Sequence, residues 1–362
     1  MARGTSTVGD IVPVLGDGTE TNALWRESQA ALVVQNGLRD SLRALLTYPT
    51  TFAGEDVIQV AGGDDFEEAS EFGEPKGLRA PTALLRLGFG FKDFDTATRF
   101  TWKFLRDAAA DQVRAVVNLA LEADNRLVFN AVMGALFNPA ARVNPEARTV
   151  FSLYNADGTV PPAYAGITHL GTHTHYVVSG GAVIDGGDLV DLIDHVSHHG
   201  YAETGRLLLL CHPNQGKAIR GFRVASGAPF DFIPSQAAPP YLTDQMLVGD
   251  KPPAAYGRIA IAGAYGPAWV AEHPLIPAGY VLAVASDGAG SARNPVGFRE
   301  HQRPEYRGLR QIPGGSPNYP LTDSFYQRSF GTGVRHRGAA AVMQIKATGT
   351  YDVPAIWSSV IA

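Results

Sequence analysis

The residues with the clearest potential for chemistry are histidines, of which the chain has ten. His173 and His175 form an H-x-H pair typical of metal-dependent hydrolases, and His195, His198 and His199 fall on one turn of an expected helix. Neutral imidazoles are common ligands of zinc and similar ions, so this set could share a divalent cation. One reading of the sequence is therefore a metal-dependent hydrolase that uses His173, His175, His195 and His198.

Other features argue against that reading. The H-x-H pair lies in the middle of the chain, whereas hydrolases of that type carry it at the end of the first barrel strand. No His-Glu-x-x-His pattern occurs, and histidines at the end of a helix interact favourably with the helix dipole. Gly216-Lys217 lacks the other residues of a phosphate-binding loop, and no Gly-x-Ser-x-Gly elbow is present. We therefore predict no catalytic residues, no cofactor and no metal.

The composition excludes several classes of protein. A net charge of -5 over 362 residues does not favour tight binding to a phosphate backbone. No apolar run reaches the roughly 20 residues of a membrane span, and the N-terminus has no apolar signal-peptide core. Cys211 is the single cysteine, so no disulfide can form within the chain. We expect a soluble protein made in the cytosol.

The first secondary-structure element expected along the chain is a helix. Apolar residues at helical spacing predict a helix from Thr21 to about Tyr48, after an extended arm. Residues 50–81 follow as a long charged segment without a core pattern, and such segments are generally functional. We interpret it as a surface for neighbouring copies of the chain, with the assembly residues Asp64, Asp65, Glu67, Glu68, Glu71, Glu74, Lys76 and Arg79.

The rest of the chain alternates helices and strands. A strand is predicted over residues 82–94, and the strongest helical pattern covers residues 101–137, long enough that it must lie along a sheet. Further helices are predicted at 187–199 and 214–222. Strands are predicted at 207–210, 259–261, 268–271 and 280–285, with a long closing strand at 334–348. This order indicates an α+β fold with a compact α/β unit in its middle.

Local motifs add a resemblance to a known family. They are Leu-Ala-Leu-Glu-Ala-Asp at 119–124, Asp-Leu-Val-Asp-Leu-Ile at 188–193, Leu-Leu-Leu-Leu-Cys-His-Pro at 207–213, Pro-Leu-Ile-Pro-Ala-Gly-Tyr-Val at 274–281, Phe-Tyr-Gln-Arg-Ser-Phe-Gly-Thr-Gly at 325–333 and Ala-Ala-Ala-Val at 339–342. In this order, from about residue 21 to 350, the chain resembles the major capsid protein of tailed bacteriophages, the Hong Kong 97-type shell subunit.

The resemblance implies an architecture and a function. It implies an N-terminal arm and helix over residues 1–49, a β-hairpin E-loop over 50–81, a peripheral domain with a spine helix over 82–183 and 324–362, and an α/β axial domain over 184–323. It further implies self-assembly into hexamers and pentamers of an icosahedral virion head. That head would enclose double-stranded DNA without sequence-specific binding. Scaffolding, portal and decoration proteins are the implied partners. An encapsulin-like compartment shell shares this fold and stays open as a third function.

Some relatives join an E-loop lysine covalently to an asparagine of a neighbouring subunit. Lys76 is the one lysine of the loop, and Asn294 and Asn318 are candidate acceptors. An amine attacks only when it is neutral, which requires a dry pocket that the sequence does not identify. We therefore expect subunits without this crosslink.

Overall fold

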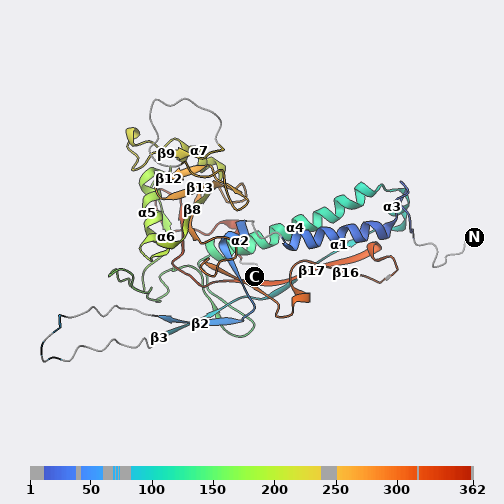
Figure 1. Ribbon diagram of the computed structural model, residues 1–362, viewed down its shortest axis with the longest axis horizontal. Coiled ribbons are helices and arrows are strands. Elements are labelled where there is room, and N and C mark those ends of the chain that lie inside the picture. Colours follow the sequence, from blue (N-terminus) through green and yellow to red (C-terminus); the bar gives the residue numbers. More distant parts are fainter. Residues whose placement is uncertain are drawn as a thin grey trace, which may run out of the picture.

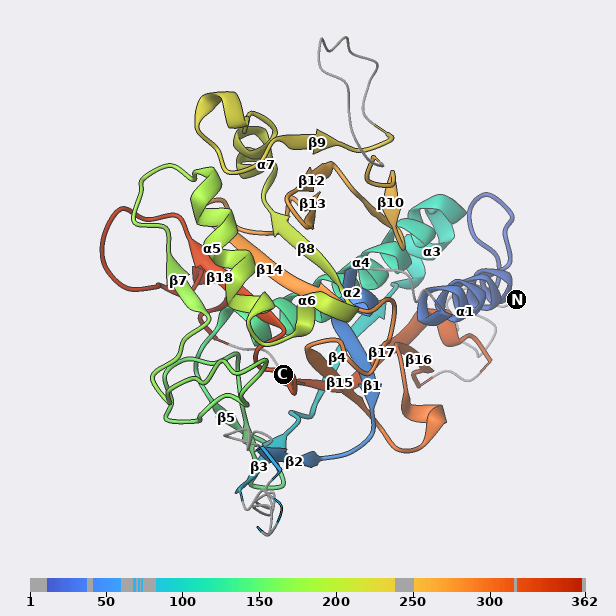
Figure 2. The ribbon, with the colours of Figure 1, turned by 60° about the vertical axis from the view of Figure 1, so that its left-hand side comes forward.

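The computed structural model describes residues 12–37, 42–59, 68, 69, 71, 73, 83–237, 251–315 and 318–359. Two sheets joined by a long helix form the body, and a two-stranded hairpin projects away from it (Figures 1 and 2). The α+β class expected from the sequence is confirmed. Within the described residues, no helix has the length and apolarity needed to cross a membrane.

The larger sheet has seven strands. Their order is β7 (Tyr176–Val178), β18 (Ala340–Gln344), β14 (Tyr280–Ser286), β8 (Arg206–Cys211), β13 (Ala268–Glu272), β12 (Gly263–Tyr265) and β9 (Phe232–Pro234). Every residue of β14 is buried, as is every residue of β8 after Arg206. A strand covered on both faces needs a continuous apolar run, which is why the sequence located these two strands correctly.

Alternate residues of these central strands face two separate cores. Leu208 and Leu282 pack in one core with the C-terminal end of α4 (Ala110–Phe137). Leu209 and Val281 pack in the other with α5 (Gly186–Ser197) and Ile219 of α7 (Pro213–Arg220). The sheet is therefore a middle layer between helices, as the alternation of strands and helices predicted.

The long helix α4 connects this layer to the rest of the body. Its 28 residues make it about 42 Å long. Its first half lies beside α1 (Thr21–Gly37), as Figure 1 shows. Asp124, in its middle, pairs with Arg328 of β17 (Asp323–Val334) at 2.5 Å, and both side chains are buried. The aspartate that ends the Leu-Ala-Leu-Glu-Ala-Asp motif thus joins the helix to a sheet.

That second sheet has five strands around β17. Along one edge β17 pairs with β4 (Lys92–Arg99), and along the other with β16 (Arg310–Pro313) and β15 (Val296–Glu300). β1 (Thr47–Thr50) adds to β15 in parallel. Shorter elements complete the described chain: α2 (Leu42–Leu46), β5 (Arg142–Val143), β6 (Thr149–Val150), α6 (Tyr201–Thr204), β10 (Ala255–Tyr256), β11 (Ile259–Ala260) and four 3₁₀ turns at 224–226, 304–306, 320–322 and 355–357.

The helix predicted over residues 101–137 is in fact two helices. α3 (Trp102–Asp107) begins at the capping hydroxyl of Thr101 and ends where Ala108 turns extended, with ψ of 149°. A new helix then starts because the Ala110 amide donates to Asp17 Oδ2 at 2.7 Å. Asp17 comes from the distant N-terminal arm, and the second capping group is local, because Gln112 Oε1 accepts from the Ala109 amide at 3.0 Å.

Three other predictions at element ends were wrong. The first helix does not continue to Tyr48, because α1 ends at Gly37, residues 42–46 form the separate helix α2, and residues 47–50 form β1. Residues 82–94 hold one strand, β3 (Ala83–Gly88), and the start of β4. The closing strand predicted at 334–348 is replaced by β17, which ends at Val334, and by the shorter β18. The other predicted helices and strands are confirmed to within a few residues.

The two sheets cross the domain limits expected at residues 184 and 323. β7 and β18 lie outside that range but pair into the seven-stranded sheet. β15 and β16 lie inside it but pair into the five-stranded sheet. The chain therefore passes several times between the two halves of the body.

Candidate functional site

The projecting hairpin consists of β2 (Gly54–Gln59) and β3 and forms a sheet of its own. The two strands pair in antiparallel register from Gly54 opposite Gly88 to Gln59 opposite Ala83. Among the described strands, no third strand pairs with either of them. Figure 1 shows β2 and β3 at the periphery of the body, apart from the two larger sheets. An isolated two-stranded ribbon in water is marginally stable, so its base needs support.

The base of the hairpin has that support. The buried Asn144 donates through Nδ2 to the carbonyls of Ala53 (2.8 Å) and Phe89 (3.1 Å), which precede and follow the two strands. Two ion pairs fix the strands to the body, Glu55 to Arg335 at 2.7 Å and Asp56 to Arg148 at 3.0 Å. The hairpin is thus held in a defined direction.

Further out, the hairpin exposes apolar side chains. Ile58 of β2 is 57% exposed, and Leu84, its partner in β3, is 55% exposed. Phe52, just before the hairpin, is 64% exposed. Apolar side chains paired on an isolated ribbon are a feature of surfaces that another chain covers.

The charged residues predicted for assembly fall between β2 and β3 in the sequence. Glu68 and Glu71 are exposed. Asp64, Asp65, Glu67, Glu74, Lys76 and Arg79 lie outside the described residues.

One candidate for a crosslink to Lys76 is already engaged within its own chain. Asn294 is fully buried, and its Nδ2 donates to the carbonyls of Gly288, Thr47 and Ala44 at 2.8 to 3.2 Å. Asn318 is exposed. The position of Asn294 is therefore explained by turn stabilisation, and it offers no surface amide to a neighbour.

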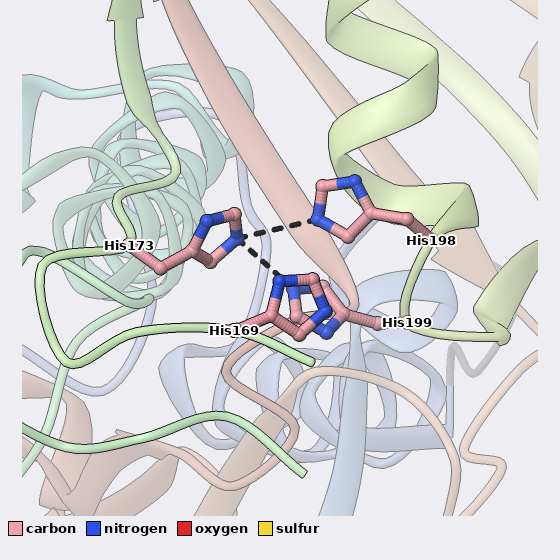
Figure 3. Close-up of side chains that lie close together, drawn as sticks. All are labelled: His169, His173, His198 and His199. Atoms are coloured by element: carbon pink, nitrogen blue, oxygen red, sulfur yellow. Dashed lines mark hydrogen bonds between the residues drawn. The ribbon is translucent and has the colours of Figure 1, made fainter. Parts of the chain in front are cut away.

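Six of the ten histidines gather in a cluster where the loop before β7 meets the end of α5. The Nε2 atoms of His173, His175 and His199 lie 2.9 to 3.1 Å from one another. His198 Nε2 lies 3.2 Å from that of His173 (Figure 3). His169 completes a group whose ligand atoms, with those of His173, His198 and His199, all lie within 4.8 Å. His195 lies at the edge, its ring 5.7 Å from that of His198.

Two members of the cluster have buried nitrogen atoms in different situations. His175 is completely buried, and its Nδ1 donates to the Ala340 carbonyl at 2.6 Å. A carbonyl can only accept, so the proton of the neutral ring is on Nδ1 and the Nε2 lone pair faces the cluster. Nε2 of His169 is buried and makes no hydrogen bond among the described residues.

The environment keeps these rings neutral at physiological pH. Burial, reinforced by the neighbouring imidazoles, lowers the pKa of His173 and of His198 to about 4 and that of His199 to about 2. Burial lowers the pKa of His175 well below its ordinary value. Each ring therefore has one nitrogen lone pair free to accept a proton or bind a cation.

The sequence found this cluster only in part. The structure brings His173, His175 and His198 together as proposed for a shared site, but His195 bonds through Nδ1 to the Asp191 carbonyl of its own helix. His169 was absent from the histidines expected to share a cation, and His199 was among them but not among the four residues named for a hydrolase. The sequence feature that could have identified both residues is the concentration of histidines in one segment, because six of them fall within residues 169–199.

Comparison with solved structures finds several that are similar to this chain. A structure from Mycobacterium phage Patience is 41% identical, covers 99% of this chain and 97% of that chain, and superposes with a TM-score of 0.74. The capsid of a native GTA particle is 14% identical, covers 85% of this chain and 91% of that one, with a TM-score of 0.49. The holo-SrpI encapsulin complex from Synechococcus elongatus PCC 7942 is 14% identical, covers 97% and 95%, with a TM-score of 0.45. No protein-family model and no curated protein matches the chain.

Proposed function

The chain belongs to the tailed-phage major capsid proteins of the Hong Kong 97 type, and we propose that its β2–β3 hairpin is the arm by which each subunit holds its neighbour. As a major capsid protein it assembles with copies of itself into the icosahedral shell of the virion. The observation that supports the hairpin's role is its construction, with a base fixed to the body and an exposed apolar pair further out.

The energetics favour a partner over free solvent. Ile58 and Leu84 together leave a cross-strand apolar pair in water, and covering such side chains contributes roughly 25 cal/mol per Å². The free strand edges also offer backbone groups to another chain. We propose that a neighbouring subunit covers this ribbon, and that Glu68 and Glu71, which fall between β2 and β3 in the sequence, contact basic groups there.

We also propose a division of the body. The seven-stranded sheet with α5 and α7 is the axial domain, and the five-stranded sheet with α1 and the first half of α4 is the peripheral domain. Relative to limits at residues 184 and 323, this moves β7 and β18 to the axial domain and β15 and β16 to the peripheral one.

The proposed partners are other copies in hexamers and pentamers, together with scaffolding, portal and decoration proteins. The shell would enclose DNA without sequence-specific binding, consistent with a net charge of -5. We propose a structural role without catalysis, as fits a subunit of a capsid shell.

We propose that non-covalent contacts alone join the subunits. The position of Asn294 supports this, because its amide is used inside its own chain. Boiled mature particles should then give a single band near 38.5 kDa on a denaturing gel. A ladder that disappears in Lys76→Ala would contradict this.

The assembly role of the hairpin is tested by shortening it. Residues 60–82 are replaced by Asn-Gly, which fits a two-residue turn between the paired Gln59 and Ala83. The shortened chain should keep its thermal midpoint and sediment as a single subunit or small oligomer, whereas the full chain forms particles. Particles of normal size and yield from the shortened chain would overturn the proposal.

A further inference from the structure

Hydrogen bonds alone cannot explain the short distances between the Nε2 atoms at the centre of the histidine cluster. A neutral imidazole nitrogen carries either one proton or one lone pair in the ring plane. Among the three Nε2 atoms of His173, His175 and His199, at least two must be of the same kind. At least one of the three contacts of 2.9 to 3.1 Å therefore sets proton against proton or lone pair against lone pair.

A cation removes this conflict, because it accepts all the lone pairs at once. Metal–nitrogen bonds to imidazole are about 2.0–2.1 Å long, which separates ligand nitrogens by about 2.9 Å at right angles and by about 3.4 Å in a tetrahedron. Four separations fall in this interval: those of His173 Nε2 from the Nε2 atoms of His175, His199 and His198, and that between His175 and His199, at 2.9 to 3.2 Å.

The surroundings also match those of a metal ligand set. The Nδ1–H group of His175 donates a hydrogen bond to the Ala340 carbonyl. This bond fixes the orientation of the ring and directs the Nε2 lone pair toward the other histidines. The buried Nε2 of His169 has no hydrogen-bond partner among the described residues. A buried polar atom left without a partner is costly, so a ligand beside it is favoured.

We propose that this cluster binds a divalent transition-metal ion, with Zn²⁺ the preferred probe, through the Nε2 atoms of His173, His175 and His199. His198 is the fourth ligand, and His169 lies beside it as a further donor. Imidazole ligands suit zinc, copper and nickel, and do not suit magnesium or calcium.

The position of the site gives the ion a structural role. Three of its histidines come from the irregular segment between β6 and β7, and two come from the end of α5. An ion there would tie a long loop to the helix that covers the seven-stranded sheet. Within one subunit this chain has no disulfide to do the same, since Cys211 is its single cysteine. Ions bound by the native state stabilise it by mass action.

The same ion would act close to the hairpin. A cavity beside the cluster is lined by His199 and Tyr154 together with Val57 and Leu85 of the hairpin. An ion that holds His199 in place would therefore also hold part of the cavity that Val57 and Leu85 line.

The test uses the full-length protein without a polyhistidine tag. Purified protein should carry about one transition-metal ion per chain by elemental analysis. Chelation should lower its thermal midpoint by at least about 3 °C, and Zn²⁺ should restore it while Mg²⁺ does not. Co²⁺ in place of Zn²⁺ should give visible absorption bands of nitrogen coordination.

Variants assign the ion to the cluster. His175→Gln and His199→Gln should each lose the bound metal and the response to Zn²⁺, and His301→Gln, outside the cluster, should keep both. If either variant fails to fold, the Zn²⁺ and Mg²⁺ responses of the unaltered chain still decide. Unaltered protein that retains no zinc and shows no shift with Zn²⁺, or variants that retain a full complement, would overturn the proposal.

Discussion

The strands at the centre of the seven-stranded sheet and those of the β2–β3 hairpin differ in how completely their own chain covers them. In β14 every residue is buried, and both edges are paired, to β8 and to β18. In β2 the one partner is β3, and Ile58 is more than half exposed. The first region is complete within one chain. The second is exposed in the single chain, and we propose that a neighbouring subunit covers it in the shell.

The largest effect of a single change is expected inside the complete region. Asp124→Ala leaves Arg328 buried without its carboxylate, and removing one partner of a buried pair costs about 3–5 kcal/mol. Denaturant unfolding of unassembled subunits measures this loss. The matched control is Asp111→Ala on the same helix, whose exposed pair with Arg114 is worth at most about 1 kcal/mol. Equal losses in the two variants would show that the body does not depend on its internal pairing.

A smaller effect is expected where the two regions meet. Asn144→Ala removes the amide that bonds both chain segments at the base of the hairpin, at a cost of about 1–3 kcal/mol. The hairpin then loses its fixed direction, so particle yield should fall more than stability does. Asn118→Ala, exposed on α4, serves as the control and should change neither quantity. A normal particle yield from the Asn144 variant would mean that the direction of the hairpin does not matter.

The smallest effect on folding is expected within the hairpin itself. Ile58→Ser should change the free energy of unfolding of the free subunit by no more than about 0.5 kcal/mol, because the side chain is largely in water. Assembly should nevertheless weaken, as seen by a higher subunit concentration needed to form particles. Ile58→Val keeps the apolar surface and should assemble normally. A large loss of subunit stability in the Ser variant would place Ile58 in its own subunit's core.

The elements that were predicted correctly from the sequence are those that form because of the residue pattern in their own segment. The apolar runs of β8 and β14 and the periodic face of α5 were identified because burial on both faces, or on one helical face, leaves a direct pattern. β17 was missed because its strand carries Arg328, whose burial depends on Asp124 far away in the sequence. The break before α4 was missed for the same reason, since the distant Asp17 supplies one of its two capping groups.

The histidine cluster shows the same limit. Helical spacing placed His195, His198 and His199 on one turn, but α5 ends at Ser197. The chain therefore turns His199 toward His173 and His175, while His195 bonds the carbonyl of Asp191. Which rings face each other depends on how the segment before β7 packs against the end of α5, two segments that are distant in the sequence.

The contrast between the two regions is tested most directly by amide hydrogen exchange, measured on unassembled subunits and on assembled particles of the same chain. The account predicts that β8 and β14 are protected in both states, and that residues 54–59 and 83–88 exchange quickly in the free subunit and slowly in the particle. Equal exchange of the hairpin amides in the two states would contradict the claim that a neighbouring subunit completes it.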